Sequence, residues 1–179
     1  MLRPLRYIVL ALALAACKAN PPHTAERVAD DGTVMLVGTA SLDSLQNEPF
    51  DSWYEANRNE YRPNPETIDK IKPLLKDVHI TLLLGTWCKD SRREVPRFVK
   101  ILEEAGYSPG TVEVIAVDRD KTTPGQFEGG LELLQVPTFI FYRHGEELGR
   151  IVEFPIEDLE SDMLKILSGQ PYRHAYDWD

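Results

Sequence analysis

The clearest patterns of apolar and polar residues lie between residues 78 and 118. Residues 78–84 read VHITLLL, a nearly continuous apolar run with β-branched residues, which is typical of a buried strand. Residues 88–104 then place apolar side chains at helical spacing, which predicts a helix with one buried side. VEVIAVD at 112–118 predicts a second buried strand. A helix between two such strands predicts a parallel pair with a right-handed crossover.

The following fifty residues predict the rest of one domain. A polar loop leads to LELL at 131–134, which we expect to form a short helix. VPTFIFY at 136–142 and the apolar run at 148–154 flank a turn and predict an antiparallel hairpin. An amphipathic pattern at 156–167 predicts the last helix. Together these elements predict an α/β fold, a three-layer α/β/α sandwich around a central mixed sheet, over residues 78–169.

Residues 34–77 show a different pattern, which we interpret as a helical extension. Aromatic side chains recur at helical spacing, at Phe50, Trp53, Tyr54 and Tyr61. A second helix start is signalled by Asn64-Pro65-Glu66, which combines a capping side chain, a proline for the first turn and an acidic residue near the helix N-terminus. The aromatic and acidic tail, residues 170–179, is expected to pack on the domain.

The first residues carry targeting information rather than fold information. Residues 1–16 combine two arginines with an apolar stretch of about ten residues, which is too short to span a bilayer and predicts a signal peptide. The stretch ends in LAAC, which resembles the lipoprotein cleavage box of bacteria and implies a lipid on Cys17. Residues 17–33 then read as a tether. We expect a lipid-anchored, periplasm-facing envelope protein, with Lys18 favouring the outer membrane.

Charge and cysteine content limit which partners and which reactive groups we expect. The formal net charge is −9, and no basic stretch is available to neutralise phosphates, so nucleic acid is not an expected partner. The spacing of the histidines does not indicate a metal site. The chain has two cysteines, and a lipid on Cys17 would leave Cys88 as its one thiol. That thiol follows Trp87 at the predicted helix start, where free backbone N–H groups favour the thiolate.

Three features in order resemble the thioredoxin family. They are Trp87-Cys88 at the strand-to-helix corner, Pro96 eight residues later, and Val136-Pro137-Thr138. The resemblance covers residues from about 78 to 168, and the mature chain is similar to bacterial thioredoxin-family lipoproteins with a GTWC-x-DS signature. It implies a cis Val136-Pro137 bond whose loop faces the sulfur and binds an extended substrate segment.

Two positions depart from the family pattern. Ser91 stands where the family has a second cysteine, and Leu82 stands where it has a buried aspartate. A serine hydroxyl cannot resolve a mixed disulfide, although it could donate a hydrogen bond to the sulfur. Without the second thiol, an intramolecular dithiol cycle is excluded. We also expect Asp118 to cap its loop rather than to replace the missing acid.

Monothiol chemistry is the leading functional hypothesis. Cys88 would attack a protein or small-molecule disulfide and hold it until an external thiol releases it, with no cofactor. A second hypothesis is a redox-silent binding module on a lipid anchor. A third is a thiol peroxidase in which Thr86 and Arg92 or Arg93 polarise the peroxide.

Overall fold

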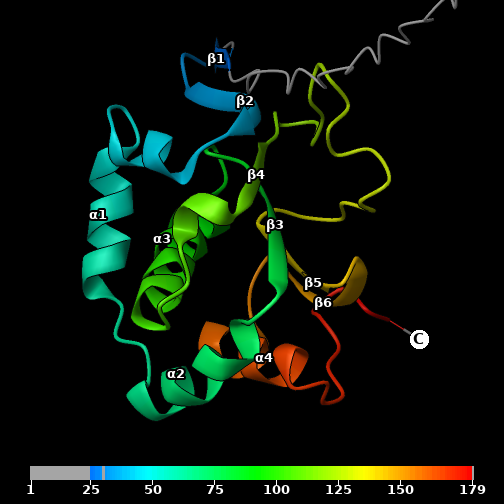
Figure 1. The fold of residues 1–179 in the computed structure, drawn as a ribbon. Coiled ribbons are helices and arrows are strands. Elements are labelled where there is room, and N and C mark those ends of the chain that lie inside the picture. Colours follow the sequence, from blue (N-terminus) through cyan, green and yellow to red (C-terminus); the bar gives the residue numbers. More distant parts are fainter. Residues whose placement is uncertain (1–24, 30, 179) are drawn as a thin grey trace, which may run out of the picture.

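Six strands form one mixed sheet in the computed structural model, which describes residues 25–29 and 31–178 (Figure 1). The strand order is β1-β2-β4-β3-β5-β6. The strands are β1 Ala25–Val28, β2 Val34–Ala40, β3 Val78–Leu84, β4 Glu113–Ala116, β5 Thr138–Arg143 and β6 Glu146–Val152. Only β3 and β4 pair in parallel, as the helix between them requires, and the other neighbours are antiparallel. The mixed sheet of the sequence prediction is confirmed.

Four α-helices accompany the described strands, with short 3-10 turns between some of them. The helices are α1 Asp51–Glu60, α2 Pro65–Ile71, α3 Lys89–Glu104 and α4 Leu159–Leu167, and the 3-10 turns are Leu42–Gln46, Lys72–Leu75 and Pro109–Thr111. Asn64 caps α2 by accepting from the backbone N–H groups of Glu66 and Thr67, which confirms the predicted helix start. Asp158 caps α4 in the same way, by accepting from the Ser161 N–H.

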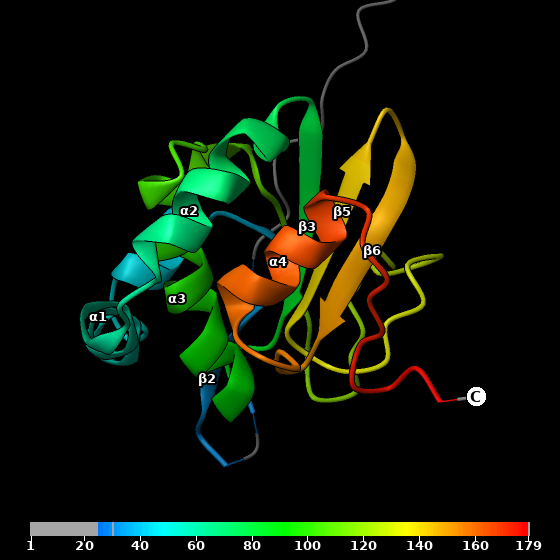
Figure 2. The same cartoon turned by 90° about the horizontal axis from the view of Figure 1, so that it is seen from below.

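All four helices pack on one face of the sheet (Figure 2). In β3, Ile80, Leu82 and Leu84 point into the core that these helices share. Leu83 points to the opposite face, where the described covering comes from the loop between β4 and β5, through Phe127, Leu131 and Leu133. The described residues therefore form two layers, and the expected three-layer sandwich is wrong.

The sequence of the β4–β5 loop explains why no helix covers the second face. Pro124, Gly125, Gly129 and Gly130 interrupt the segment, and glycine and proline are the poorest helix formers. The short helix expected at 131–134 is absent. Its leucines instead alternate, so that Leu131 and Leu133 pack on the sheet and Leu134 is exposed.

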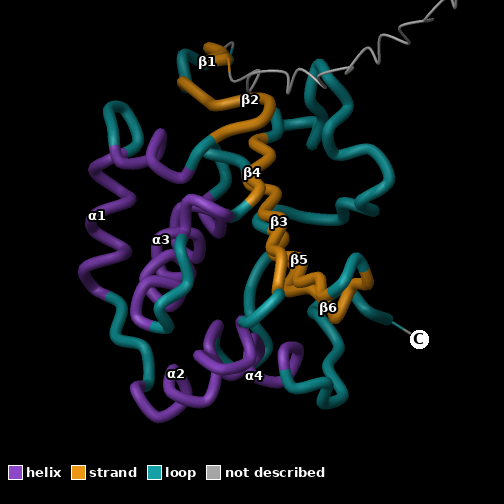
Figure 3. Tube along the Cα trace, in the orientation of Figure 1, coloured by secondary structure: helices purple, strands orange, loops and turns teal. Residues whose placement is uncertain are grey.

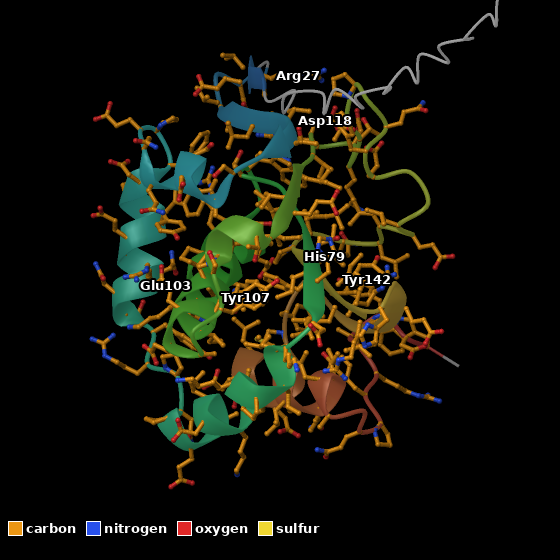
Figure 4. All side chains as sticks on the ribbon, in the orientation of Figure 1. Arg27, His79, Glu103, Tyr107, Asp118 and Tyr142 are labelled. Atoms are coloured by element: carbon orange, nitrogen blue, oxygen red, sulfur yellow. The ribbon has the colours of Figure 1, made fainter. Side chains whose placement is uncertain are left out.

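The N-terminal region is not purely helical. Residues 34–40, expected to begin a helical extension, form β2 and pair with β4, while part of the expected tether at 17–33 forms β1. The apolar run VMLV supplies β2 with three core side chains, Met35, Leu36 and Val37. Arg27 of β1 forms an ion pair with Asp118, 3.4 Å away, just beyond β4 (Figure 4). The predicted helices α1 and α2 do follow β2.

The C-terminal tail folds back along β6, as the loop tube in Figure 3 shows. The Tyr172 hydroxyl donates to Asp162 of α4 at 2.9 Å, and the Tyr176 hydroxyl donates to Glu153 just after β6. Packing of the tail on the domain is thus confirmed.

The targeting predictions concern residues that the structure does not describe. Residues 1–16 and Cys17 lie outside the described ranges. Within those ranges, no helix combines the length and the apolar character needed to cross a bilayer.

Candidate functional site

Cys88 stands at the corner between β3 and α3. It is the N-cap residue of α3, with an extended backbone. Its N–H donates to the Gly85 carbonyl at 2.9 Å, and its carbonyl accepts from the Arg92 N–H at 3.0 Å. These two bonds fix the corner on both sides of the cysteine. The side chain is a free thiol and is half-buried, so the sulfur is held in place but still reached by solvent.

The sulfur contacts the loop that begins β5. Cys88 Sγ donates a hydrogen bond to the Val136 carbonyl at 3.2 Å. It makes no capping bond to the N–H groups of α3. The expected approach of the sulfur to this loop is present, whereas the expected direct contact between the sulfur and the helix amides is not.

The Val136-Pro137 peptide bond is cis, in agreement with the family resemblance. The loop is held from both directions. The Thr138 hydroxyl donates to the Gln135 carbonyl at 2.6 Å, and the Glu153 N–H donates to the Pro137 carbonyl at 2.7 Å. Val136, Pro137 and Thr138 are buried, so the part of this loop that faces the sulfur is mainly backbone.

Ser91 has a structural partner instead of the sulfur. Its Oγ accepts from the Gly85 N–H at 3.2 Å, and only 1% of the residue is exposed. Among the described hydrogen bonds, none joins Ser91 to Cys88. The suggested hydroxyl-to-sulfur bond is therefore not formed, and Ser91 instead ties the first turn of α3 to the end of β3.

Trp87 closes the corner from the side of the β4–β5 loop. Its indole N–H donates to the Val117 carbonyl at 2.9 Å. The ring lies over Gly85 so closely that a Cβ there would come within 2.7 Å of the indole. Trp87 and Cys88 both pack against the small apolar cluster on the sheet face that the helices leave uncovered. Glycine at position 85 is what allows this arrangement.

The two arginines in the first turn of α3 contact groups other than the sulfur. Arg92 Nε donates to the Thr86 carbonyl at 2.6 Å, and its guanidinium lies 5.9 Å from the centre of the Trp53 ring. Arg93 is paired with Asp90 at 2.8 Å and with Glu94. The two carboxylates offset the charge of Arg93, whereas Arg92 keeps its charge but is held by a carbonyl and an aromatic ring.

The same contacts weaken the peroxidase hypothesis. Thr86 is fully buried, and its hydroxyl accepts from the Leu36 N–H at 3.1 Å. Its hydroxyl is thus directed to β2 rather than to the sulfur. Because the two arginines are also occupied, the corner offers no assembled group of donors to polarise a peroxide.

Neither Leu82 nor Asp118 supplies the buried acid that the family carries at this corner. Leu82 is fully buried and packs in the helical core. Asp118 accepts from the N–H groups of Asp120 and Thr122 at 3.1 and 3.0 Å, which confirms that it caps its own loop. Nor does the described part of the chain gather three or more potential metal ligands in one place.

Sequence reasoning missed two residues at the edge of the site. Glu153 bonds the Pro137 carbonyl through its N–H and accepts from Tyr176 through its carboxylate. The hydrogen bond to Glu153, followed by burial and the charges of Glu153 and Asp90, raises the pKa of Tyr176 to about 12. Tyr176 is therefore linked to the proline loop through Glu153. Only the aromatic character of the tail hinted at this position.

Comparisons with known proteins concern the family and the fold of the chain. The family model described as "Thioredoxin" matches residues 45–163, more than half of the chain, and it begins well before the expected start near residue 78. Among solved structures, PA1234, a protein of unknown function from Pseudomonas aeruginosa, aligns with a TM-score of 0.57 at 12% identity. That alignment covers 73% of this chain and 93% of that chain, and it shows a shared fold.

Other comparisons add no function. An HIV epitope scaffold of the 4E10 type aligns over 73% of this chain and 89% of its own, at 15% identity, but its TM-score of 0.33 is too low to support a shared fold. No curated protein matches the chain.

Proposed function

The chain belongs to the thioredoxin family, and from this premise we propose that it exchanges thiols and disulfides through Cys88 alone. One observation carries the proposal. The only free cysteine of the described residues is half-buried at the N-terminus of α3, with its sulfur 3.2 Å from the carbonyl that precedes a cis proline. This arrangement joins a nucleophile to a backbone segment that can hold an extended substrate.

The reaction has two balanced steps. The Cys88 thiolate attacks one sulfur of a substrate disulfide, so that a mixed disulfide forms and the other substrate sulfur leaves as a thiolate. An external thiolate then attacks the substrate sulfur of the mixed disulfide and regenerates the Cys88 thiolate. The electron pairs come from the external thiol, which ends in a disulfide with the substrate. Ser91 has no sulfur, so the second step depends on a separate molecule.

The neighbours of Cys88 have positioning roles in this scheme. The Val136 carbonyl accepts a hydrogen bond from the Cys88 thiol, and when that hydrogen bond is broken the carbonyl can accept from a substrate N–H instead. Trp87 shields one side of the corner, and Ser91 fixes the first turn of α3 through Gly85. Thr138 holds the loop through its bond to Gln135.

Trapping of adducts tests this proposal. Cells that produce the chain are quenched with acid and alkylated, and extracts are compared on non-reducing gels with and without dithiothreitol. We expect thiol-sensitive adducts of the wild-type chain and their loss in Cys88→Ala. Absence of adducts from the wild-type chain would count against exchange chemistry.

A redox-silent binding module is the second candidate, and one observation favours it. The sulfur already lies in hydrogen-bond contact with the Val136 carbonyl, so in this structure the loop that would hold a substrate is occupied by the cysteine itself. In that case Cys88 would react with iodoacetamide no faster than the cysteine of a short unstructured peptide. Faster alkylation than the peptide favours the exchange function.

We further propose that a lipid on Cys17 anchors the chain in the bacterial envelope, facing the periplasm. The LAAC sequence supports the proposal, and Lys18 favours the outer membrane. Radiolabelled palmitate should label the wild-type chain but not Cys17→Ala, and the variant should leave the membrane fraction. Labelling of both chains would contradict the assignment.

A further inference from the structure

Exposed apolar side chains concentrate in the segments around the proline loop. Five large apolar residues are exposed in the described chain, and four of them belong to three segments around the proline loop. These four are Leu134 (48% exposed), Phe154 (41%), Ile156 (53%) and Trp178 (82%). The fifth, Val28, lies on the edge strand β1 at the other end of the sheet order. Such a grouping of apolar side chains on the surface marks an interaction site.

Hydrogen bonds join two of these segments to the proline loop and to each other. Glu153, at the start of the segment that carries Phe154, bonds the Pro137 carbonyl. Tyr176 of the tail bonds the Glu153 carboxylate, which brings the tail to the same edge. Asp162 of α4 holds both segments. Its carboxylate accepts from the Ile156 N–H at 2.6 Å and from the Tyr172 hydroxyl at 2.9 Å.

The third segment, the end of the β4–β5 loop, meets the tail over β6. Leu134 and His174 line one cavity of about 360 Å³ with Arg150. The three segments therefore form one continuous edge around the proline loop. We call this edge the rim surface. Its residues are Leu134, Glu153, Phe154, Ile156, Tyr176 and Trp178.

Carboxylates outnumber cationic groups on the rim surface. Two cationic side chains border it: Arg150, which pairs with Glu147, and Lys121, whose Nζ donates to the Leu134 carbonyl at 2.8 Å. Residues 131–135, 153–158 and 174–178 contain five carboxylates and no lysine or arginine. The carboxylates are Glu132, Glu153, Glu157, Asp158 and Asp177. Lys165 pairs with Glu157 from α4, but Glu132 and Asp177 are exposed. A second copy of this acidic chain and an anionic lipid surface would both be repelled by such a rim.

We infer that the rim surface docks an extended polypeptide segment in which apolar side chains alternate with lysine or arginine. The inference rests on the proposed exchange at Cys88, since it names the class of substrate that the thiol would meet. A polypeptide fits because the apolar contacts come from three separate segments, which successive side chains of one strand can reach. Basic side chains fit because unlike charges across an interface favour association.

Peptide binding tests the inference without the thiol reaction. Two fluorescent peptides of about twelve residues share the same leucines and phenylalanines and contain serine in place of cysteine. The positions between the apolar residues are lysine in one peptide and glutamate in the other. Fluorescence anisotropy with the full chain should show at least about tenfold tighter binding of the lysine peptide, with the difference reduced by added salt. Equal affinities, or no binding of either peptide, would overturn the inference.

Variants locate the binding. Phe154→Ser combined with Ile156→Ser should weaken binding of the lysine peptide by about tenfold, because two apolar contacts are lost. Val28→Ser, an exposed apolar position on β1, is the matched control and should bind as the wild type does. Glu132→Lys with Asp177→Lys should remove the preference for lysine. Equal weakening by the control, or a retained preference, would contradict the assigned surface.

A separate assay keeps this inference distinct from the proposed function. Exchange at Cys88 is measured separately, on the wild-type chain with a small neutral disulfide that does not extend over the rim surface. If exchange occurs but the lysine peptide gains no advantage, the docking inference fails and the exchange function stands. If the lysine peptide binds at the rim but no exchange occurs, the docking surface stands and the exchange function fails.

Discussion

Replacement of Ser91 by cysteine converts the monothiol corner into a dithiol one. Ser91 lies one helical turn beyond Cys88, so a thiol there comes within reach of the Cys88 sulfur. The new thiolate would attack the Cys88 sulfur of a mixed disulfide, form an intramolecular disulfide with it and release the substrate as a thiolate. We therefore expect Ser91→Cys to shorten the life of the adduct.

The substitution has two effects, a faster decay of the adduct and a loss of stability, and the size of each follows from the structure. A tethered thiol acts at an effective concentration of millimolar or above, so against about 0.1 mM external thiol the adduct should decay at least about tenfold faster. The cost is one neutral hydrogen bond, from the Gly85 N–H to Ser91 Oγ at 3.2 Å. Because sulfur accepts weakly, unfolding should become easier by about 0.5–1.5 kcal/mol.

The assay follows a glutathione adduct on Cys88 by intact-mass spectrometry after excess disulfide is removed. Ser91→Ala is the matched control, since it loses the same hydrogen bond but supplies no thiol. Its adduct should last as long as that of the wild type. An adduct of Ser91→Cys that persists as long as the control would refute the assigned geometry of the corner.

Further variants probe the core, the corner and the tail. Phe98→Ala removes a fully buried ring and should cost about 3–5 kcal/mol in urea unfolding, whereas a cost below about 1 kcal/mol would contradict its core position. Gly85→Ala should displace the Trp87 indole and cost about 1–3 kcal/mol, with a changed tryptophan emission, while an unchanged spectrum would contradict the close contact. Burial lowers the pKa of His174, whose Nδ1 accepts from the Tyr176 N–H, so its contribution to stability is full above the unfolded pKa of 6.5 and is lost as the pH falls through the folded value. His174→Gln should therefore lose less stability than the wild type between pH 7.5 and pH 5, and an equal loss would contradict this role.

Local patterns were enough to predict the elements that carry the thiol. The apolar run at 78–84 and the helical spacing after Cys88 fixed β3 and α3 closely. The two helix starts at Asn64 and Cys88 depend on neighbouring residues alone, and both agree with the structure. The hairpin was also predicted, although β6 lies at Glu146–Val152, two residues before the expected position.

Layering could not be predicted in the same way. The loop at 118–135 lacks regular structure because proline and glycine disfavour a helix, but which face it covers depends on Phe127 and the two leucines packing against β4 and β5. The strand at 34–40 was missed because the aromatic pattern that follows it directed the interpretation toward helices. Its role became visible only through pairing with β4, about 75 residues later in the chain.

In the candidate site, too, some contacts followed from the sequence pattern and others depend on residues far apart in the chain. Trp87, Cys88 and the Val136-Pro137 loop meet as the family pattern implied. Ser91 forms no hydrogen bond with the sulfur among the described contacts, and its Oγ accepts from the Gly85 N–H instead. Glu153 and Tyr176 entered the site through a contact between side chains 23 residues apart, which no local pattern encodes.

The rate at which Cys88 forms a mixed disulfide tests the central claim most directly. The purified chain is mixed at pH 7 with a small neutral disulfide, and the second-order rate is compared with that of an unstructured cysteine peptide. If the corner activates the sulfur, Cys88 should react at least about tenfold faster than the peptide, and Cys88→Ala should not react. A rate equal to or below that of the peptide would contradict an exchange function at this corner.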